Sequence, residues 1–370
     1  MIKRSVLGSP PIDHIRNGAA AARQRAGTTG YPTPAILTRA RSLAAPELHT
    51  CVEQLHPDLG AIVGYHLGWC DARGNPITDG GGKGVCLALA TLSAETITAP
   101  PLTAAPGAAA IELIHVFTHL HDDVMDHDEQ RRNRTSAWKQ FGPGPTVLAG
   151  DALYTEALRS VAGVSRHSSL TATRLLLDMC DQIGFGQAED LRFEQLPLRG
   201  PGAVGVPQYL SMAAGKTGAV YAAGLAIGAL LAGAPDPTTQ RLVSAGRALG
   251  LVAQIVDDIN GIWGDPAITG KPVGSDLRKR KKTLPIVAAV TAESVAGNRL
   301  AELLSRPPSS EDDLELLSSL VIDAGGLDVA VAQAERLHRA ALRETGAVVM
   351  PESTRSELHE LFEFIRHRHA

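Results

Sequence analysis

Two acidic stretches carry most of the chemistry that this chain of 370 residues could perform. The first reads His-Asp-Asp-Val-Met-Asp over residues 121–126, and the second contains the pair Asp257-Asp258. Carboxylates four residues apart on a helix point to the same side, so we expect Asp122 and Asp126 to share one face. Carboxylates held close together repel each other unless a cation lies between them. Such hard oxygen ligands suit Mg²⁺, which binds through carboxylates together with substrate phosphates.

Basic residues accompany both acidic stretches. Arg131 and Arg132 follow the first stretch, whereas Lys271 and the basic run 278–282 follow the second. Arginine and lysine side chains bind phosphate oxygens through charged hydrogen bonds. The combination of acids and bases therefore predicts a diphosphate that is held by metal ions and by basic side chains together.

The overall composition excludes other classes of protein. Apolar residues make up 44% of the chain, which is ample for a core, but aromatic residues make up only 4%. So few aromatic rings argue against a surface that stacks nucleic-acid bases, and a formal net charge of −4 gives no basic footprint for nucleic acid. The sequence contains no uncharged apolar run as long as a membrane span, so we expect no transmembrane segment.

Cysteine spacing points to a reducing compartment. The cysteines show no close CxxC pairing, so neither a zinc site nor a disulfide framework is expected. We therefore expect a cytoplasmic protein. The cysteines are Cys51, Cys70, Cys86 and Cys180.

Apolar residues recur with a helical period almost throughout the chain from residue 35. Clusters of Gly and Pro separate these segments, and long β-branched alternation is missing. We therefore expect an all-α fold in which residues 35–370 form one helical bundle with a central active-site cavity. Residues 1–34 have no apolar core, and we expect them to be a disordered extension. The predicted helices cover residues 37–55, 84–98, 107–126, 146–164, 168–191, 207–232, 238–261, 283–304, 311–323, 327–345 and 354–368.

Residues 80–285 resemble the trans-isoprenyl diphosphate synthases, or polyprenyl synthetases, which have the isoprenoid synthase fold. Asp122, Asp123 and Asp126 match the first DDxxD motif of this family, and Asp257 matches the start of the second. The resemblance implies that these carboxylates, with Asp258, bind three Mg²⁺ ions per site, which Mn²⁺ could replace. In the family the metal ions bridge to the diphosphate of the allylic substrate.

The resemblance also implies which residues bind the two diphosphates. Arg131 and Arg132 match an arginine pair that holds the allylic diphosphate and isopentenyl diphosphate. His115 matches a histidine that touches isopentenyl diphosphate, although a histidine on an apolar helix is also an ordinary core residue. Lys216 and Thr217 match a Lys-Thr pair in which the lysine reaches the allylic diphosphate and the threonine lies near the reacting carbons.

Further matches complete the implied binding set. Gln187 belongs to a segment that resembles GQxxDL, and Gln254 precedes the second acidic pair. Lys271 matches the lysine of a GKxxGxD continuation, and Lys281 aligns with a further basic residue near the diphosphates. Phe117, five residues before Asp122, matches a position where a bulky aromatic limits product length in the family. Its alternative role is ordinary core packing.

Two positions depart from the family pattern. The upstream GGKxxRP motif keeps Lys83, which would bind isopentenyl diphosphate, but Cys86 stands where the motif has arginine. A charged, bidentate contact is thereby lost. In the second acidic stretch, Gly261 occupies the third aspartate position, and Asp265 is the next acid along the chain. We therefore expect the site to bind isopentenyl diphosphate weakly, whereas its ability to ionise the allylic diphosphate is expected to be intact.

The resemblance implies a Mg²⁺-dependent short-chain transferase. It would condense isopentenyl diphosphate with an allylic diphosphate to give farnesyl or geranylgeranyl diphosphate, and it would be a homodimer. Two alternatives stay open. A terpene synthase of the same fold would ionise and cyclise an allylic diphosphate without a co-substrate, and a non-catalytic subunit of a heteromeric synthase would serve a partner chain.

Overall fold

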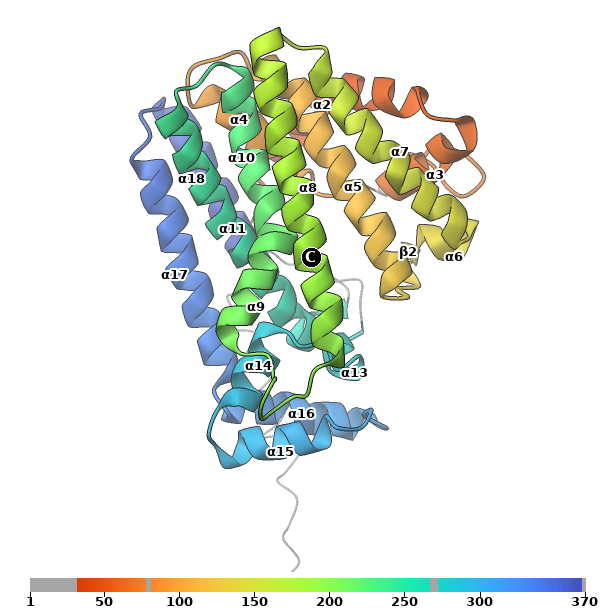
Figure 1. The fold of residues 1–370 in the computed structure, drawn as a ribbon, viewed down its shortest axis with the longest axis vertical. Helices are drawn as coiled ribbons and strands as arrows, with labels where there is room; N and C mark the ends of the chain where they lie inside the picture. The colour runs from red at the N-terminus through yellow and green to blue at the C-terminus, as the bar shows by residue number, and fades with distance from the viewer. Residues whose placement is uncertain (1–31, 78–80, 267–271, 368–370) are drawn as a thin grey trace, which may run out of the picture.

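The structure of the chain, a computed structural model, describes residues 32–77, 81–266 and 272–367. Helices form nearly all of it (Figure 1). The sole sheet of the described part is a hairpin of two strands, each two residues long. The elements are α2 (Ala35–Glu53), α3 (Pro57–Leu67), α4 (Val85–Glu95), η1 (Pro101–Ala104), α5 (Ala105–Met125), β1 (Gln130–Arg131), β2 (Arg134–Thr135), α6 (Ala137–Phe141), α7 (Pro143–Ala162), α8 (Arg166–Gln195), α9 (Val206–Ala213), the π-helical turn η2 (Ala214–Gly218), α10 (Ala219–Leu231), α11 (Asp236–Trp263), α13 (Ser275–Arg278), α14 (Leu284–Thr291), α15 (Val295–Leu303), α16 (Glu311–Asp323), α17 (Gly326–Gly346) and α18 (Glu352–Arg366).

The all-α prediction is confirmed, and each predicted helical segment is present. The predicted segment 283–304 is divided into α14 and α15, because the Ser294 side chain accepts a hydrogen bond from the Gly297 N–H and begins a new helix. Helix α3 was not predicted. It begins with proline at its first position and ends at Gly68, whose φ of 76° is the left-handed end that glycine favours. Residues 1–31 of the predicted extension lie outside the described part.

Long helices surround the centre of the molecule. Helix α10 lies against α4, α5, α8 and α11, while α5 packs along α7 (Figure 1). Helices α17 and α18 cover α11, and α2 covers α4 and α5. The short helices α14, α15 and α16 form the lower end of the molecule in Figure 1. Residues from α11 belong to both apolar clusters of the core, so this helix ties the two ends of the fold together.

One helical segment of the described residues, 206–231, is long and apolar enough by composition to cross a membrane. Most of that segment is buried inside the protein, against α4, α8 and α11. This burial explains its composition, since an apolar helix fits a protein core as well as a membrane. The segment is therefore the central helix of the bundle.

Candidate active site

A cavity of about 960 Å³ opens between α5, α8, η2, α10 and α11. It brings together both acidic stretches and the basic residues that the sequence places far apart. Two predicted site residues are not among those lining it: Asp123 is turned away from it, and Lys271 lies outside the described residues. The predicted residues that line the cavity are Lys83, His115, Phe117, Asp122, Asp126, Arg131, Arg132, Gln187, Lys216, Thr217, Gln254, Asp257, Asp258 and Lys281.

The first acidic stretch ends α5, where Asp122 and Asp126 share the face toward the cavity. Each carboxylate meets a lysine from another element. Lys216 Nζ lies 3.1 Å from Asp122 Oδ1 and 2.7 Å from Asp190 Oδ2, and Lys281 pairs with Asp126. The cluster therefore gathers three carboxylates from two helices around two ammonium groups.

These pairs keep Lys216 and Asp122 charged. Burial acts to lower the pKa of Lys216, but the neighbouring Asp122 and Asp190 raise it to about 12. Burial acts to raise the pKa of Asp122, but Lys216, together with Arg131 and Lys281, outweighs burial and holds that pKa below its usual value. Asp122 is therefore a charged carboxylate over the whole physiological pH range.

Asp123 turns to the opposite side of α5 and is 1% exposed. Both its oxygens accept from Arg131, with Nε 2.8 Å from each and Nη2 2.6 Å from Oδ1. Arg131 itself lines the cavity. The buried carboxylate therefore fixes the direction in which this guanidinium reaches the cavity.

Arg131 and Arg132 lie on the β1–β2 hairpin directly after α5. Arg132 and Asn133 form its turn with φ of 53° and 58°, which is the backbone of a two-residue hairpin turn with both φ positive. Glycine or asparagine usually occupies such positions, so an arginine there is strained. The turn places the Arg132 guanidinium over the backbone of Gly82, where a Cβ would lie 2.9 Å from Nη2.

The second acidic stretch is held in a different way. Asp258 is 4% exposed, and its Oδ2 accepts from the Tyr209 hydroxyl and, at 2.8 Å, from the Leu284 N–H. Its Oδ1 accepts from Gln254 Nε2 at 3.0 Å, and Gln254 Oε1 accepts from the Thr217 hydroxyl at 2.6 Å. Burial raises the pKa of Asp258 to about 7 even though these donors act to lower it.

The position of Gly261 is explained by a residue that the sequence analysis did not select. The Asp276 carboxylate lies against Gly261, where an added Cβ would be 2.0 Å from Oδ2. Asp276 and Asp257 both line the cavity, whereas Asp265 lies beyond the end of α11 and is exposed. Asp276 thus brings a carboxylate to the place where the motif has its third aspartate. The signal was present in the sequence as the last residue of the GKxxGxD segment.

A π-helical turn carries Lys216 and Thr217 into the cavity. The turn lies between α9 and α10 and packs against α8. At the contact, Gly186 of α8 has no room for a side chain, because a Cβ would lie 2.4 Å from the backbone nitrogen of Lys216. Insertions of this kind in a helix redirect the residues that follow and are frequent at functional sites. The small residues around Lys216 therefore serve the close approach of two helices.

A group of histidines lies beside Arg132 at the other end of the cavity. The ring centroids of His115 and His119 are 4.1 Å apart, and those of His66 and His119 are 5.9 Å apart. Burial lowers the pKa of both His66 and His119 well below the usual value, and the charges of nearby arginine and histidine groups lower it further. Sequence reasoning selected only His115 from this group.

Phe117 lies on α5 at the apolar part of the cavity wall. The centroid of its ring lies 4.7 Å from that of His121, in an edge-on arrangement, and 6.2 Å from that of Tyr154 on α7. Cys180 and Ile183 of α8 also line the cavity. Phe117 therefore both packs against its neighbours and faces the cavity.

Comparisons with known proteins agree with this geometry. The polyprenyl synthetase family model matches residues 68–321. Over 339 residues the chain is 39% identical to a (2E,6E)-farnesyl diphosphate synthase of Mycobacterium tuberculosis, covering 90% of this chain and 93% of that protein. It is 41% identical to a geranylgeranyl diphosphate synthase of the same organism, covering 87% and 90%.

A crystal structure of a polyprenyl synthetase from Streptomyces coelicolor A3(2) superposes with a TM-score of 0.84 at 42% identity, covering 90% of this chain and 98% of that one. The chain belongs to the polyprenyl synthetase family. Within that family it is a short-chain trans-prenyltransferase, and members of the family use divalent metal ions.

Proposed function

We propose that the enzyme condenses isopentenyl diphosphate with an allylic diphosphate to give farnesyl or geranylgeranyl diphosphate. One observation carries the proposal: a single cavity is lined by two acidic stretches, by Lys216, and by a separate basic group around Lys83 and Arg132. Two groups of cations in one cavity suit a reaction with two diphosphates. The relatives' names support the products.

Magnesium ions would be held by Asp122 and Asp126 on one side and by Asp257 on the other, with three ions per site. The donor set fits this metal, because the ligands are carboxylate oxygens and the Asp122 and Asp126 carboxylates already need cations to offset their charge. When bound, the metal stabilises the negative charge of the departing diphosphate. Mn²⁺ would replace Mg²⁺.

The chain's own residues would bind the substrates and exclude water. Lys216 and Arg131 would hold the allylic diphosphate, assisted by Lys281. Arg132, Lys83 and His115 would hold isopentenyl diphosphate with its double bond toward the allylic carbon.

Once the allylic carbon–oxygen bond breaks, that double bond attacks the allylic cation, and the released diphosphate takes the proton that is lost. The cavity must stay dry because water would quench the cation.

Asp123 and Asp258 would act through their neighbours. Asp123 is fully engaged by Arg131, so its role would be to orient that guanidinium. Asp258 would orient Gln254 and, through it, Thr217. Gln187 lines the same wall of the cavity and would face the reacting carbons.

The test of the proposed reaction is product analysis by mass spectrometry. Purified enzyme with Mg²⁺ is incubated with dimethylallyl, geranyl or farnesyl diphosphate, each with and without isopentenyl diphosphate. We expect farnesyl or geranylgeranyl diphosphate only when isopentenyl diphosphate is present. No product under any condition would favour the non-catalytic subunit instead.

Cys86 favours one alternative function. It lines the cavity where the family motif has arginine, so the site for the co-substrate has lost a charged group. A terpene synthase would need only the allylic and metal end of the cavity. Cyclic hydrocarbon formed from an allylic diphosphate without isopentenyl diphosphate would establish that alternative.

Phe117 would limit product length by closing the cavity beneath a growing prenyl chain. Phe117→Ala should open space next to Tyr154 and shift the products to longer chains. The folded state should lose no more than about 3–5 kcal/mol, as for other buried Phe→Ala changes. An active, folded variant with an unchanged product distribution would leave Phe117 with core packing alone.

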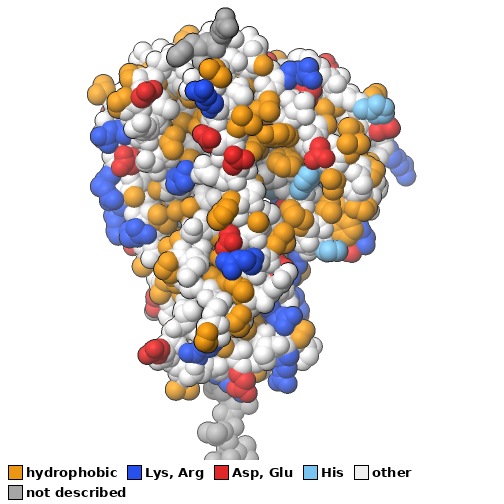
Figure 2. Space-filling view, viewed as in Figure 1, with side chains coloured by type: hydrophobic (Ala, Val, Ile, Leu, Met, Phe, Trp, Pro, Cys, Tyr) orange, Lys and Arg blue, Asp and Glu red, His pale blue; other side chains and the backbone are white. Residues whose placement is uncertain are grey.

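Self-association through α7 and α8 would make the enzyme a homodimer in the cytoplasm. These helices carry exposed large apolar side chains, including Phe185 at 66% and Leu148 at 56% exposure. Figure 2 shows apolar side chains gathered on one face of the molecule. Exposed apolar patches of this kind mark interaction sites. Phe185→Asp should yield monomers in sedimentation analysis, and a wild-type monomer would contradict the proposal.

A further inference from the structure

We propose that Arg41, on α2, supplies the guanidinium that Cys86 does not, and binds the diphosphate of isopentenyl diphosphate. The inference rests on the proposed function, since it assigns a further residue to the co-substrate end of that cavity. Arg41 lies far from the motif in sequence and outside residues 68–321, which the family model matches.

The stem of Arg41 lies across the glycine-rich loop that opens the cavity. Gly84 has a φ of 74°, and a Cβ built on it would lie 3.0 Å from Arg41 Cγ and 3.3 Å from Cδ and Nε. Gly84, Lys83 and Cys86 all line the cavity. The charged end of Arg41 is therefore next to the loop whose own arginine position holds a thiol.

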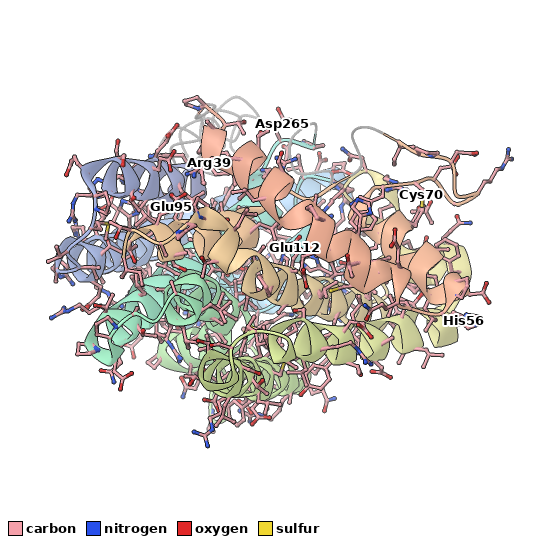
Figure 3. The ribbon with its side chains drawn as sticks, turned by 90° about the horizontal axis from the view of Figure 1, so that it is seen from above. Arg39, His56, Cys70, Glu95, Glu112 and Asp265 are labelled. Atoms are coloured by element: carbon pink, nitrogen blue, oxygen red, sulfur yellow. The ribbon has the colours of Figure 1, made fainter. Side chains whose placement is uncertain are left out.

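A buried carboxylate interacts electrostatically with both guanidinium groups at this end of the cavity. Glu112 of α5 is 7% exposed and lines the cavity, and Figure 3 shows it in the middle of the bundle. Burial raises the pKa of Glu112, whereas the charges of Arg132 and Arg41 act to lower it. Arg132 rests on Gly82 and Arg41 on Gly84, so the two guanidinium groups flank one short loop.

Arg39 provides a comparison on the same helix. Its guanidinium is occupied by ion pairs with Glu95 and Glu357, and Figure 3 shows Arg39 beside Glu95. Arg41 forms no ion pair with any carboxylate of the described residues, and its Nε donates to Leu37 O at 3.2 Å. No carboxylate within the described residues satisfies the terminal N–H groups of Arg41, and these groups suit an incoming anion.

The charges around the loop match a diphosphate. Arg132, Lys83 and Arg41 bring three positive charges, and Glu112 offsets one of them. A diphosphate that bears several negative charges is bound well by guanidinium groups, because their planar N–H pairs match two phosphate oxygens. The site therefore keeps two guanidinium groups although the motif has lost one.

The experiment compares Arg41→Met, which keeps the stem on Gly84 but removes the charge, with Arg41→Lys, which keeps a charge. Titration calorimetry measures binding of isopentenyl diphosphate, and steady-state assays measure KM for both substrates. Arg41→Met should lower the affinity for isopentenyl diphosphate about tenfold, as expected for the loss of one charged hydrogen bond. The KM of the allylic substrate should stay unchanged. Arg41→Lys should restore part of the affinity.

Arg39→Met is the matched control, since it removes a guanidinium two residues away that is held by Glu95 and Glu357. It should lower the unfolding temperature and leave the affinity for isopentenyl diphosphate unchanged. Equal affinity of wild type and Arg41→Met would overturn the assignment of Arg41. Failure of the wild type to condense the substrates, with Arg41→Met still weakening binding, would overturn the proposed reaction and keep the binding site.

A double-mutant cycle tests whether Arg41 takes the role of the motif arginine that Cys86 replaces. Cys86→Arg should lower the KM for isopentenyl diphosphate by roughly tenfold in the wild-type background. If Arg41 holds the place of the missing guanidinium, Arg41→Met should cost much less in the Cys86→Arg background than alone. Strictly additive effects would show that the two positions serve different contacts.

Discussion

In the first acidic stretch, carboxylates of α5 face cations from other elements, whereas the buried Asp258 of the second stretch faces neutral donors. Asp122 meets Lys216, and Asp126 meets Lys281. Asp258 meets a tyrosine hydroxyl, an amide side chain and a backbone N–H. The first arrangement preserves negative charge, and the second lets burial raise the pKa of the carboxyl to about 7.

The difference teaches which carboxylates can exchange partners. A lysine that pairs with a carboxylate at a cavity wall can give way to a metal ion, because one cation replaces another. Asp258 cannot do so without giving up hydrogen bonds that hold Gln254, Tyr209 and α14 together. The two stretches thus suit different tasks, metal binding in the first and positioning in this part of the second.

The largest expected effect comes from removing a carboxylate of the first stretch. Asp122→Ala should lower turnover by about a thousandfold or more, since metal stabilisation of a leaving group is worth several kcal/mol. Circular dichroism should show an intact fold, and activity in excess chelator should vanish for the wild type. Full activity without divalent metal would remove the distinction between the two stretches.

Asp258 should reveal itself through the pH dependence of stability. Its pKa is about 7 in the folded enzyme and near the ordinary 3.8 when unfolded, so the folded state holds one extra proton between these values. Its stabilising contribution is complete below about pH 4 and is lost as the pH rises through 7. The loss amounts to about 4 kcal/mol, from 1.36 kcal/mol per pKa unit.

Chemical unfolding of metal-free enzyme measures this effect. The stability of the wild type relative to Asp258→Asn should fall as the pH rises from 4 to 7, because asparagine does not titrate. The stability of the wild type relative to Asp122→Asn should show no such decline, since the pKa of Asp122 is lowered rather than raised. If the free energy of unfolding changes with pH in the same way for wild type and Asp258→Asn, then the titrating group is not Asp258.

A smaller effect should follow from removing one donor to Asp258. Tyr209→Phe deletes the hydroxyl that donates to Oδ2 and leaves the buried ring in place. Above pH 7, where Asp258 is ionised, we expect a loss of about 1.5–3 kcal/mol in the free energy of unfolding, as for a hydrogen bond to a charged group. The pKa of Asp258 should rise further, so the decline in stability should shift to higher pH. An unchanged profile would mean that Gln254 and the Leu284 N–H suffice.

The sequence predicted the helices well because their apolar period is long and regular. The bundle and the central cavity also follow from it, since apolar helices that carry acids need a shared polar interior. The division of 283–304 was missed because a serine cap, Ser294, interrupts an otherwise continuous apolar pattern. Helix α3 was missed because its apolar run is short.

The site was predicted as a set of residues, but their partners could not be. Spacing on α5 separates Asp123 from Asp122 by one residue, which indicates different faces but not that Arg131 receives the former. The contact of Asp276 with Gly261 depends on how the chain folds back after α11. The approach of Arg41 to Gly84 joins segments that no motif relates, so only three-dimensional packing reveals it.

The smallest expected effect tests whether a lysine of the first stretch competes with metal. Lys281 pairs with Asp126, one of the proposed metal ligands, so Lys281→Gln should tighten binding of Mg²⁺ alone. The gain should be about two- to fivefold, because such partly exposed pairs are worth about 1 kcal/mol or less. The KM for the allylic diphosphate should rise by a similar factor, since the same ammonium would bind its oxygens.

Arg280→Gln is the control for this last change. It makes the same change in net charge one residue away, but the Arg280 side chain points to Ser305 O and does not line the cavity. Titration calorimetry with Mg²⁺ and metal-free enzyme should therefore separate the two variants. Weaker Mg²⁺ binding in Lys281→Gln would mean that the lysine orders Asp126 for the metal instead of competing with it. In that case the lysines and the neutral donors of Asp258 would share a positioning role, and the contrast between the two acidic stretches would lie in pKa alone.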